Sequence, residues 1–179
     1  MKLLFACFAL SYFIPVSADT NLGTCSFPNK QSDMTIENCS SNEAITKSAL
    51  RVIKFDQDGL AGGSITGKGC FWLHRSGRLK KTHCYDNGAD YFKEGLVRYI
   101  DSTGKFGFMD KRLLVVIPPL YTFAYPFEAG HAKVCIGCQS KKTADGEHSS
   151  MEGGRWMILS RNGKIFKECM DGQDYQSCL

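Results

Sequence analysis

A segment in the middle of the chain recurs after 35 residues. Its opening returns once more 50 residues later, where Gly154 and Trp156 take the places of Gly104 and Phe106. A unit of this length is too short to bury an apolar face alone, so neighbouring copies must stack on one another. The recurrence therefore predicts an array of small units of one kind. The recurring positions are Gly69 and Gly104, Phe71 and Phe106, Phe92 and Phe127, and Gly95 and Gly130.

From Gly59 onward the sequence favours strands and tight turns. Turn residues such as Ser76-Gly77 and Asn162-Gly163 separate segments rich in aromatic and branched side chains. Pro118 and Pro119 lack backbone N–H groups, so their strand must end or lie at a sheet edge. No helical period follows Leu50. We therefore expect a mostly all-β fold of tandem antiparallel β-hairpin repeats. The expected strands are 71–73, 96–100, 106–109, 114–117 and 156–159.

Residues 1–18 resemble an export signal. Lys2 precedes an apolar stretch, and small residues at 16–18 predict cleavage after Ala18. Ser11 and Pro15 interrupt the stretch, which is too short to span a membrane well. We expect an exported protein, in the periplasm or outside the cell, with no transmembrane segment after signal cleavage.

The cysteines predict a disulfide-stapled fold. Of nine cysteines, Cys7 lies in the signal segment, and an even number remains. Cys70 and Cys84 are equidistant from Gly77, so we expect them to face each other across a hairpin. The others also form neighbouring pairs along the chain. The predicted bridges are Cys25–Cys39, Cys70–Cys84, Cys135–Cys138 and Cys169–Cys178.

A less regular N-terminal region, 19–58, precedes the repeats. Ser40 and Glu43 have capping-box spacing, which predicts a short helix just after them, and 52–55 is typical of a strand. Residues 56–59 are acidic, but they lack the distal glutamate of a calcium loop and are interpreted as a turn. The repeat region is 59–179. Its units lie near 67–100, 102–138 and 153–169, followed by a C-terminal tail.

The central copy resembles a known repeat family. Residues 104–110 are Gly-Lys-Phe-Gly-Phe-Met-Asp, 115–121 are Val-Val-Ile-Pro-Pro-Leu-Tyr, and 127–134 are Phe-Glu-Ala-Gly-His-Ala-Lys-Val. This order resembles the WG-repeat family, with Phe106 where a Trp is usual. The first copy is degenerate, and the third keeps only its opening half. The resemblance covers 59–169. The chain is also similar to an exported bacterial subgroup with Cys-Ile-Gly-Cys and Asp-Gly-Glu-His after the central repeat.

The resemblance implies tandem β-hairpins packed on one another and no established catalytic chemistry. The residues themselves agree, because the aromatics can fill a shared core and the glycines permit close backbone approach. The motif positions are Gly69, Phe71, Trp72, Gly104, Phe106, Gly107, Pro118, Pro119, Tyr121, Phe127, Gly130, Gly154 and Trp156.

Two groups of residues are candidates for catalysis or metal binding. For Cys135-x-x-Cys138 a structural disulfide is the main interpretation, with zinc binding or redox activity as alternatives. The insertion 139–152 holds Asp145, Glu147 and His148, whose carboxylates and imidazole can accept protons. No nucleophile can be placed beside them from the sequence, so a solvated loop is the favoured interpretation. We expect no metal and no cofactor.

The remaining expectations concern the ligand. The net charge of +4 is mild, and Arg78, Lys80 and Lys81 are interpreted as a solvated face rather than a nucleic-acid site. We expect a non-enzymatic binding module whose partner is a protein or an envelope component. One alternative is a hydrolase or metal-dependent enzyme that uses the 145–148 loop. Another is a periplasmic inhibitor or immunity-type protein.

Overall fold

The computed structural model describes residues 23–31, 35–41, 44–143, 146, 148–169 and 178. The predicted signal segment lies outside these residues. Antiparallel strands dominate the described part, with one short helix, α1 (Lys47–Val52), near its start. This confirms the predicted fold class. No helix in the described part is long and apolar enough to cross a membrane.

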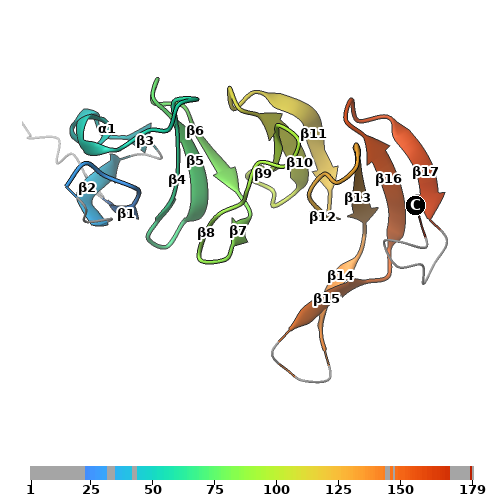
Figure 1. Cartoon of the computed structure of the whole chain (residues 1–179). Helices are drawn as coiled ribbons and strands as arrows, with labels where there is room; N and C mark the ends of the chain where they lie inside the picture. The colour runs from blue at the N-terminus through green and yellow to red at the C-terminus, as the bar shows by residue number, and fades with distance from the viewer. Residues whose placement is uncertain are drawn as a thin grey trace, which may run out of the picture.

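Three antiparallel meanders of three strands each succeed one another along the molecule (Figure 1). Short strands connect them: β7 (Cys84–Tyr85) pairs with β8 (Gly88–Ala89), and β12 (Phe123–Ala124) pairs with the first strand of the third meander. The first meander is β4 (Leu60–Ile65), β5 (Gly69–His74) and β6 (Leu79–Thr82). The second is β9 (Leu96–Ile100), β10 (Phe106–Asp110) and β11 (Val115–Tyr121). The third is β13 (His131–Ile136), β16 (Arg155–Ser160) and β17 (Ile165–Cys169).

The sequence repeat is also a structural repeat. β8 and β12 begin 35 residues apart, at Gly88 and Phe123, and so do β9 and β13, at Leu96 and His131. However, a sequence copy and a meander are offset by one strand. The copy near 67–100 supplies the last two strands of the first meander and also β9, the first strand of the second. The first two copies therefore each join two neighbouring meanders covalently.

The N-terminal strands extend the first meander into a larger sheet. β1 (Gly23–Ser26) pairs with β4 and with β2 (Thr35–Ser41), and β3 (Ala44–Ile45) follows β2. The resulting nine-stranded sheet has the order β11-β10-β9-β6-β5-β4-β1-β2-β3. A second sheet has the order β12-β13-β16-β17.

The predicted helix start and the strand at 52–55 are wrong. Ser40 lies in β2 opposite Ile45, so it pairs in a strand and does not cap a helix. The helix begins after Thr46, whose side chain accepts a hydrogen bond from the backbone N of Ala49. Val52 ends the helix, and Ile53 forms only an isolated bridge with Asn29.

The turns share one hydrogen-bond pattern. The Oδ1 atoms of Asp56, Asp101 and Asp110 each accept bonds from the backbone N–H groups two and four residues later. Gly104 lies in the left-handed region, with φ of 80°, and Leu113 occupies the same place with φ of 57°. Residues 56–59 therefore form a turn of this kind, as predicted.

All four predicted disulfides are present, but Cys70 and Cys84 do not face each other across the hairpin as expected. Cys70 and Cys84 are bonded, with 5.2 Å between their Cα atoms. The strand partner of Cys70 is Thr82, not Cys84, which lies two residues further on and begins β7. The chain bends into β7 and brings Cys84 back to Cys70. The other bridges are Cys25–Cys39, Cys135–Cys138 and Cys169–Cys178.

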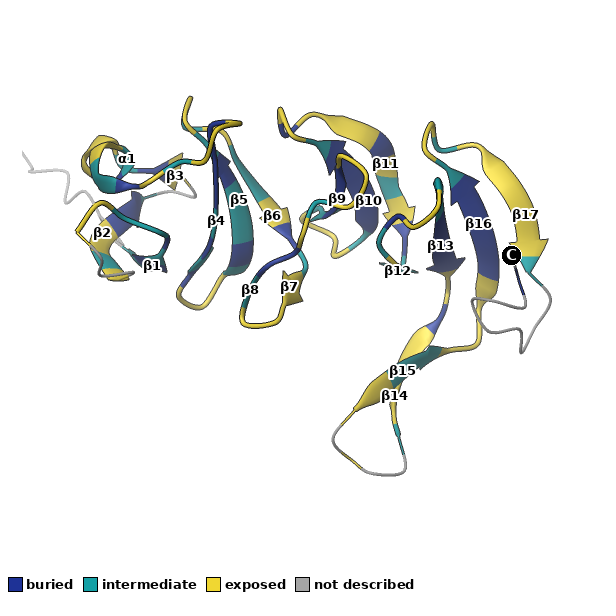
Figure 2. Ribbon diagram, viewed as in Figure 1, coloured by how far each residue is buried: buried dark blue, intermediate teal, exposed yellow. Residues whose placement is uncertain are grey.

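The apolar cores lie within and between the meanders, as the buried residues of Figure 2 show. Phe106, Tyr121 and Phe127 share the largest cluster, which joins the second and third meanders. Phe127 lies 4.7 Å, centroid to centroid, from Phe108 of β10. The expected role of these motif aromatics in a shared core is therefore seen directly.

The motif prolines lie on an edge strand. β11 continues through Pro118 and Pro119 and borders the nine-stranded sheet. A Cβ atom on Gly107 would lie 2.8 Å from Pro118 C and Pro119 N. The motif glycine is thus required because the backbone of β11 crosses directly over it.

Candidate functional site

The predicted catalytic candidates are only partly visible. Asp145 and Glu147 lie outside the described residues. His148 is exposed near the turn between β14 (Gln139–Lys142) and β15 (Ser149–Glu152), and its backbone O accepts a bond from Thr143 N at 3.0 Å. This hairpin projects away from the three meanders (Figure 1). An active site built from the three residues remains a hypothesis.

The Cys135–Cys138 pair is buried and bonded. The two residues are 0% and 3% exposed and form a small cluster with Trp156. Such burial supports the structural interpretation, because a redox disulfide must be reached by its partner thiol. Among the described residues, no group of three or more His, Cys, Asp or Glu side chains is placed to hold a metal ion.

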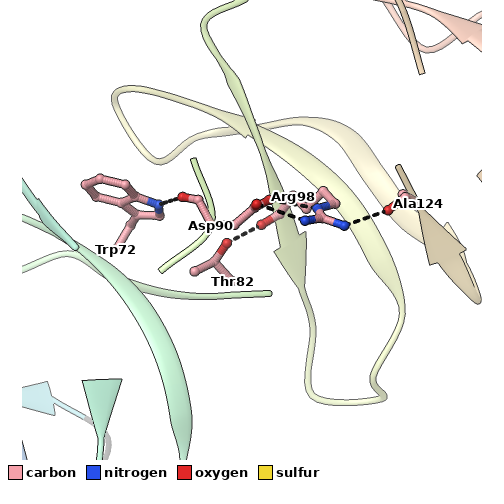
Figure 3. Close-up of polar contacts among 5 residues, drawn as sticks. All are labelled: Trp72, Thr82, Asp90, Arg98 and Ala124. Atoms are coloured by element: carbon pink, nitrogen blue, oxygen red, sulfur yellow. Dashed lines mark hydrogen bonds and ion pairs between the residues drawn. The ribbon is translucent and has the colours of Figure 1, made fainter. Parts of the chain in front are cut away.

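A buried ion pair that no sequence motif predicts joins Asp90, in the segment that connects the first two meanders, to Arg98 of the second (Figure 3). Arg98 on β9 donates from Nε to Asp90 Oδ2 at 2.7 Å and from Nη2 to Asp90 Oδ1 at 2.8 Å. Its Nη1 donates to the carbonyl O of Ala124 in β12, and Thr82 Oγ1 donates to the carbonyl O of Arg98. The indole N–H of the motif residue Trp72 donates to the carbonyl O of Asp90. The arginine thus holds strands of successive repeats in place.

A second buried cation stands one repeat later. Lys133, 35 residues after Arg98, is 5% exposed, and its Nζ lies 4.9 Å from the ring centroid of Trp156. The sequence does contain a signal for these buried cations, because Arg98 and Lys133 stand in apolar segments one repeat length apart. Because both are used inside the fold, they are not available to a ligand.

His83 lies against this network. Burial lowers the pKa of its imidazole, and the positive charge of Arg98 lowers it further, while Asp90 opposes the shift. Its ring centroid is 5.8 Å from that of Phe106. His83 is therefore a partly buried ring whose charged form its surroundings disfavour.

A candidate binding site is a groove between the first two meanders, called here the seam groove. It has a volume of about 680 Å³, within the range of small-ligand sites. Its walls are β6, the turn between β4 and β5, and the turn 101–104. The side chains that give it chemical character are Lys68, Phe71, Leu79, Lys80, Lys81 and Tyr99.

The seam groove exists because two strands part. β6 and β9 share a single pair, Thr82 and Tyr99, after which Lys81 and Ile100 diverge. In the full ladder between β5 and β6, by contrast, four consecutive residues pair. The opening therefore lies beside β6, where a further strand of the sheet would run.

The net charge of the groove is positive, because three lysines and one aspartate line it. The four ion pairs formed by described residues do not include Lys68, Lys80 or Lys81. Lys80 Nζ lies 5.4 Å from the ring centroid of Tyr99. Asp101 also lines the groove; bonds from Thr103 and Lys105 to its Oδ1 lower the pKa of its carboxyl, so its negative charge offsets part of the positive charge. The groove is suited to attract anions.

The motif glycines lie outside the groove or at its rim. Gly69 begins β5, Gly104 closes the turn 101–104, and Gly154 lies against the backbone of Gly137. Gly130 N donates to both carboxylate oxygens of Glu94, one repeat earlier, at 3.1 and 3.0 Å. These positions serve turns and contacts between repeats.

Comparison with models of protein families, with curated proteins and with solved structures finds no match for the chain.

Proposed function

We propose that the protein is an exported, non-enzymatic binding module of the WG-repeat type, which holds a protein or an envelope component outside the cytoplasm. The observation that carries the proposal is the seam groove. It is a lysine-bearing opening between two meanders, which share a buried apolar cluster and are linked further by the hydrogen-bond network around the Asp90–Arg98 pair. Binding sites are often found on such a rigid framework, and repeat arrays present extended surfaces to partners.

The location is supported by the cysteines and by the N-terminal sequence. Four bonded pairs are typical of proteins that fold in an oxidising compartment. Residues 1–18 have the order of a signal segment: a positive start, an apolar stretch and small residues. The WG-repeat assignment rests on the ordered motifs of the central copy and on the 35-residue step between equivalent strands.

The proposal is tested with the mature chain, Asp19 to Leu179, produced in an oxidising compartment and immobilised. Extracytoplasmic fractions of the source organism are passed over it and over a reduced, alkylated sample of the same chain. We expect the native chain to retain the same component repeatedly and saturably, and the unfolded chain to lose it. Retention of nothing, together with turnover in a substrate screen that His148→Ala abolishes, would refute the proposal.

A further inference from the structure

We infer that the seam groove binds an extended acidic peptide segment, which adds as a strand beside β6. This inference rests on the proposed binding function and names its ligand. The ligand chemistry follows from three features of the groove: its charge, its apolar surface and its position at a sheet edge.

The charge selects an acidic ligand. Lys68 comes from the turn between β4 and β5, whereas Lys80 and Lys81 are consecutive on β6. Consecutive strand residues point to opposite faces of a sheet, so a strand lying beside β6 meets a lysine on each face. Among the described residues, these three lysines form no ion pair, and carboxylates on the ligand would supply one.

The apolar surface selects a peptide over other polyanions. Phe71, Leu79 and Tyr99 are half-buried and line the groove together with the lysines. Sulfated sugars and phosphate backbones offer charge but no aliphatic side chains. Phe71 pairs with Lys81 across the ladder, so apolar and charged side chains share a face of the groove. A peptide that carries both acidic and aliphatic residues offers contacts to both kinds.

The edge selects an extended conformation. β6 pairs with β5 through Leu79, Lys80 and Lys81, but β9 has left its other side at these residues. The free side of a strand presents main-chain groups that a peptide strand can pair with. The free stretch is short, so affinity depends on the lysines as well as on main-chain bonds.

The probe is a fluorescein-labelled eight-residue peptide in which Glu alternates with Val, titrated into the mature chain and followed by fluorescence anisotropy. In a strand, the N–H groups of all Glu residues point to one edge and those of all Val residues to the other. Only one of these two edges faces β6. We therefore expect methylation of the backbone nitrogens on that edge to abolish binding, and methylation of those on the other edge to leave binding intact. Equal effects of the two would overturn strand addition.

The variant Lys68→Gln/Lys80→Gln/Lys81→Gln removes the three charges. Each exposed charge contact contributes about two- to threefold to affinity, and the Glu side chains of the probe lie on one face of its strand, so we expect a loss of about threefold or more. Lys47→Gln/Lys164→Gln/Lys167→Gln is the matched control, because it removes three exposed lysines on α1, the turn after β16, and β17. It should bind like the unmodified chain, and an equal loss in this control would overturn the site.

Heparin and a DNA oligonucleotide, each similarly labelled, form the competing arms. Binding of either that is as tight as that of the peptide, and that the peptide displaces, would overturn the acidic-peptide assignment. Failure of the peptide to bind would also overturn it. If the immobilised chain still retains its extracytoplasmic component, and the triple groove variant retains it equally, the proposed function stands while this inference falls.

Discussion

At the scale of single residues, the strongest polar feature is the Asp90–Arg98 pair. Both side chains are almost fully buried, and the guanidinium meets both carboxylate oxygens. Burial removes the hydration of both charges, so each depends on the other. A single substitution therefore leaves a buried charge without its partner, whereas a double substitution removes both.

We expect Arg98→Met to lower the free energy of unfolding by about 3–5 kcal/mol, the range seen when one partner of a buried pair is removed. The double variant Asp90→Leu/Arg98→Met should lose less free energy of unfolding than the single variant, because it leaves no buried charge without a partner. Urea denaturation followed by tryptophan fluorescence measures both. Lys141→Met, at an exposed ion pair with Glu152, is the control and should be unchanged within error. Equal losses in the single and double variants would contradict the assigned pairing.

His83 gives the protein a pH dependence of stability. The pKa of its imidazole is lowered in the folded state from an ordinary value of 6.5. As pH falls through 6.5, the unfolded chain takes up a proton that the folded chain resists, so stability decreases. His83→Gln should reduce the drop in melting temperature between pH 7.5 and pH 5.5. An unchanged slope in this variant would show that burial of His83 does not carry the effect.

At the scale of elements, β10 and β11 show how a motif is set by backbone contact. The pairing between them shifts register twice, first across Gly107 and again between Phe108 and Met109. A side chain at this position would press on the backbone of Ile117 and Pro118. The glycine and the two prolines of the motif therefore belong to one local structure.

Gly107→Ala tests this contact. We expect it to destabilise the fold by about 1–3 kcal/mol, as overpacking does when the neighbour is backbone that cannot move aside. Gly88→Ala, in β8, is the matched control, because nothing lies within 4 Å of its added Cβ. Thermal unfolding of the two variants should differ clearly, and similar melting temperatures would refute the crossing of β11 over Gly107.

The Cys70–Cys84 bridge stabilises the first hairpin without creating its shape. β5 and β6 pair through four residues before Cys84 is reached. Cys70→Ser/Cys84→Ser should lower stability by about 3 kcal/mol in the chain-entropy model, for a sequence separation of 14, while the β signal in circular dichroism persists. Non-reducing peptide mapping of the unmodified chain should recover Cys70 joined to Cys84. Any other partner would show that the first meander is wrongly placed.

At the scale of the whole molecule, the three meanders stabilise one another by packing together. The β14–β15 hairpin takes little part in that packing. β13 and β16 pair along six residues directly before and after it. Most side chains of β14 and β15 are exposed, and only Met151 reaches the cluster of Trp156. The hairpin is therefore an appendage on a continuous framework.

Replacing Ser140–Met151 with Asn-Gly should leave that framework intact. Gln139 and Glu152 already face each other, and the replacement supplies a favourable two-residue turn between them. We expect a melting temperature within a few degrees of the parent, and unchanged affinity for the acidic peptide. Loss of cooperative unfolding in calorimetry would show that the hairpin is part of the fold.

Short-range spacing determined much of this protein. The strand and turn positions and the four cysteine pairs depend on neighbours along the chain, where glycine, asparagine and branched residues act directly. The 35-residue repeat determined that small units must stack, because no unit buries its own face. The residue types at 56–59 were sufficient to predict the turn there, because Asp and Gly are ordinary turn residues.

Only the tertiary structure decided how distant residues meet. It placed Thr82 rather than Cys84 opposite Cys70, moved the helix start from Ser40 to Thr46, and assigned Arg98 to Asp90. It also opened the seam groove, because β6 and β9 stay paired at one position only. Register, burial and the parting of strands result from packing across the whole molecule, which short-range spacing does not specify.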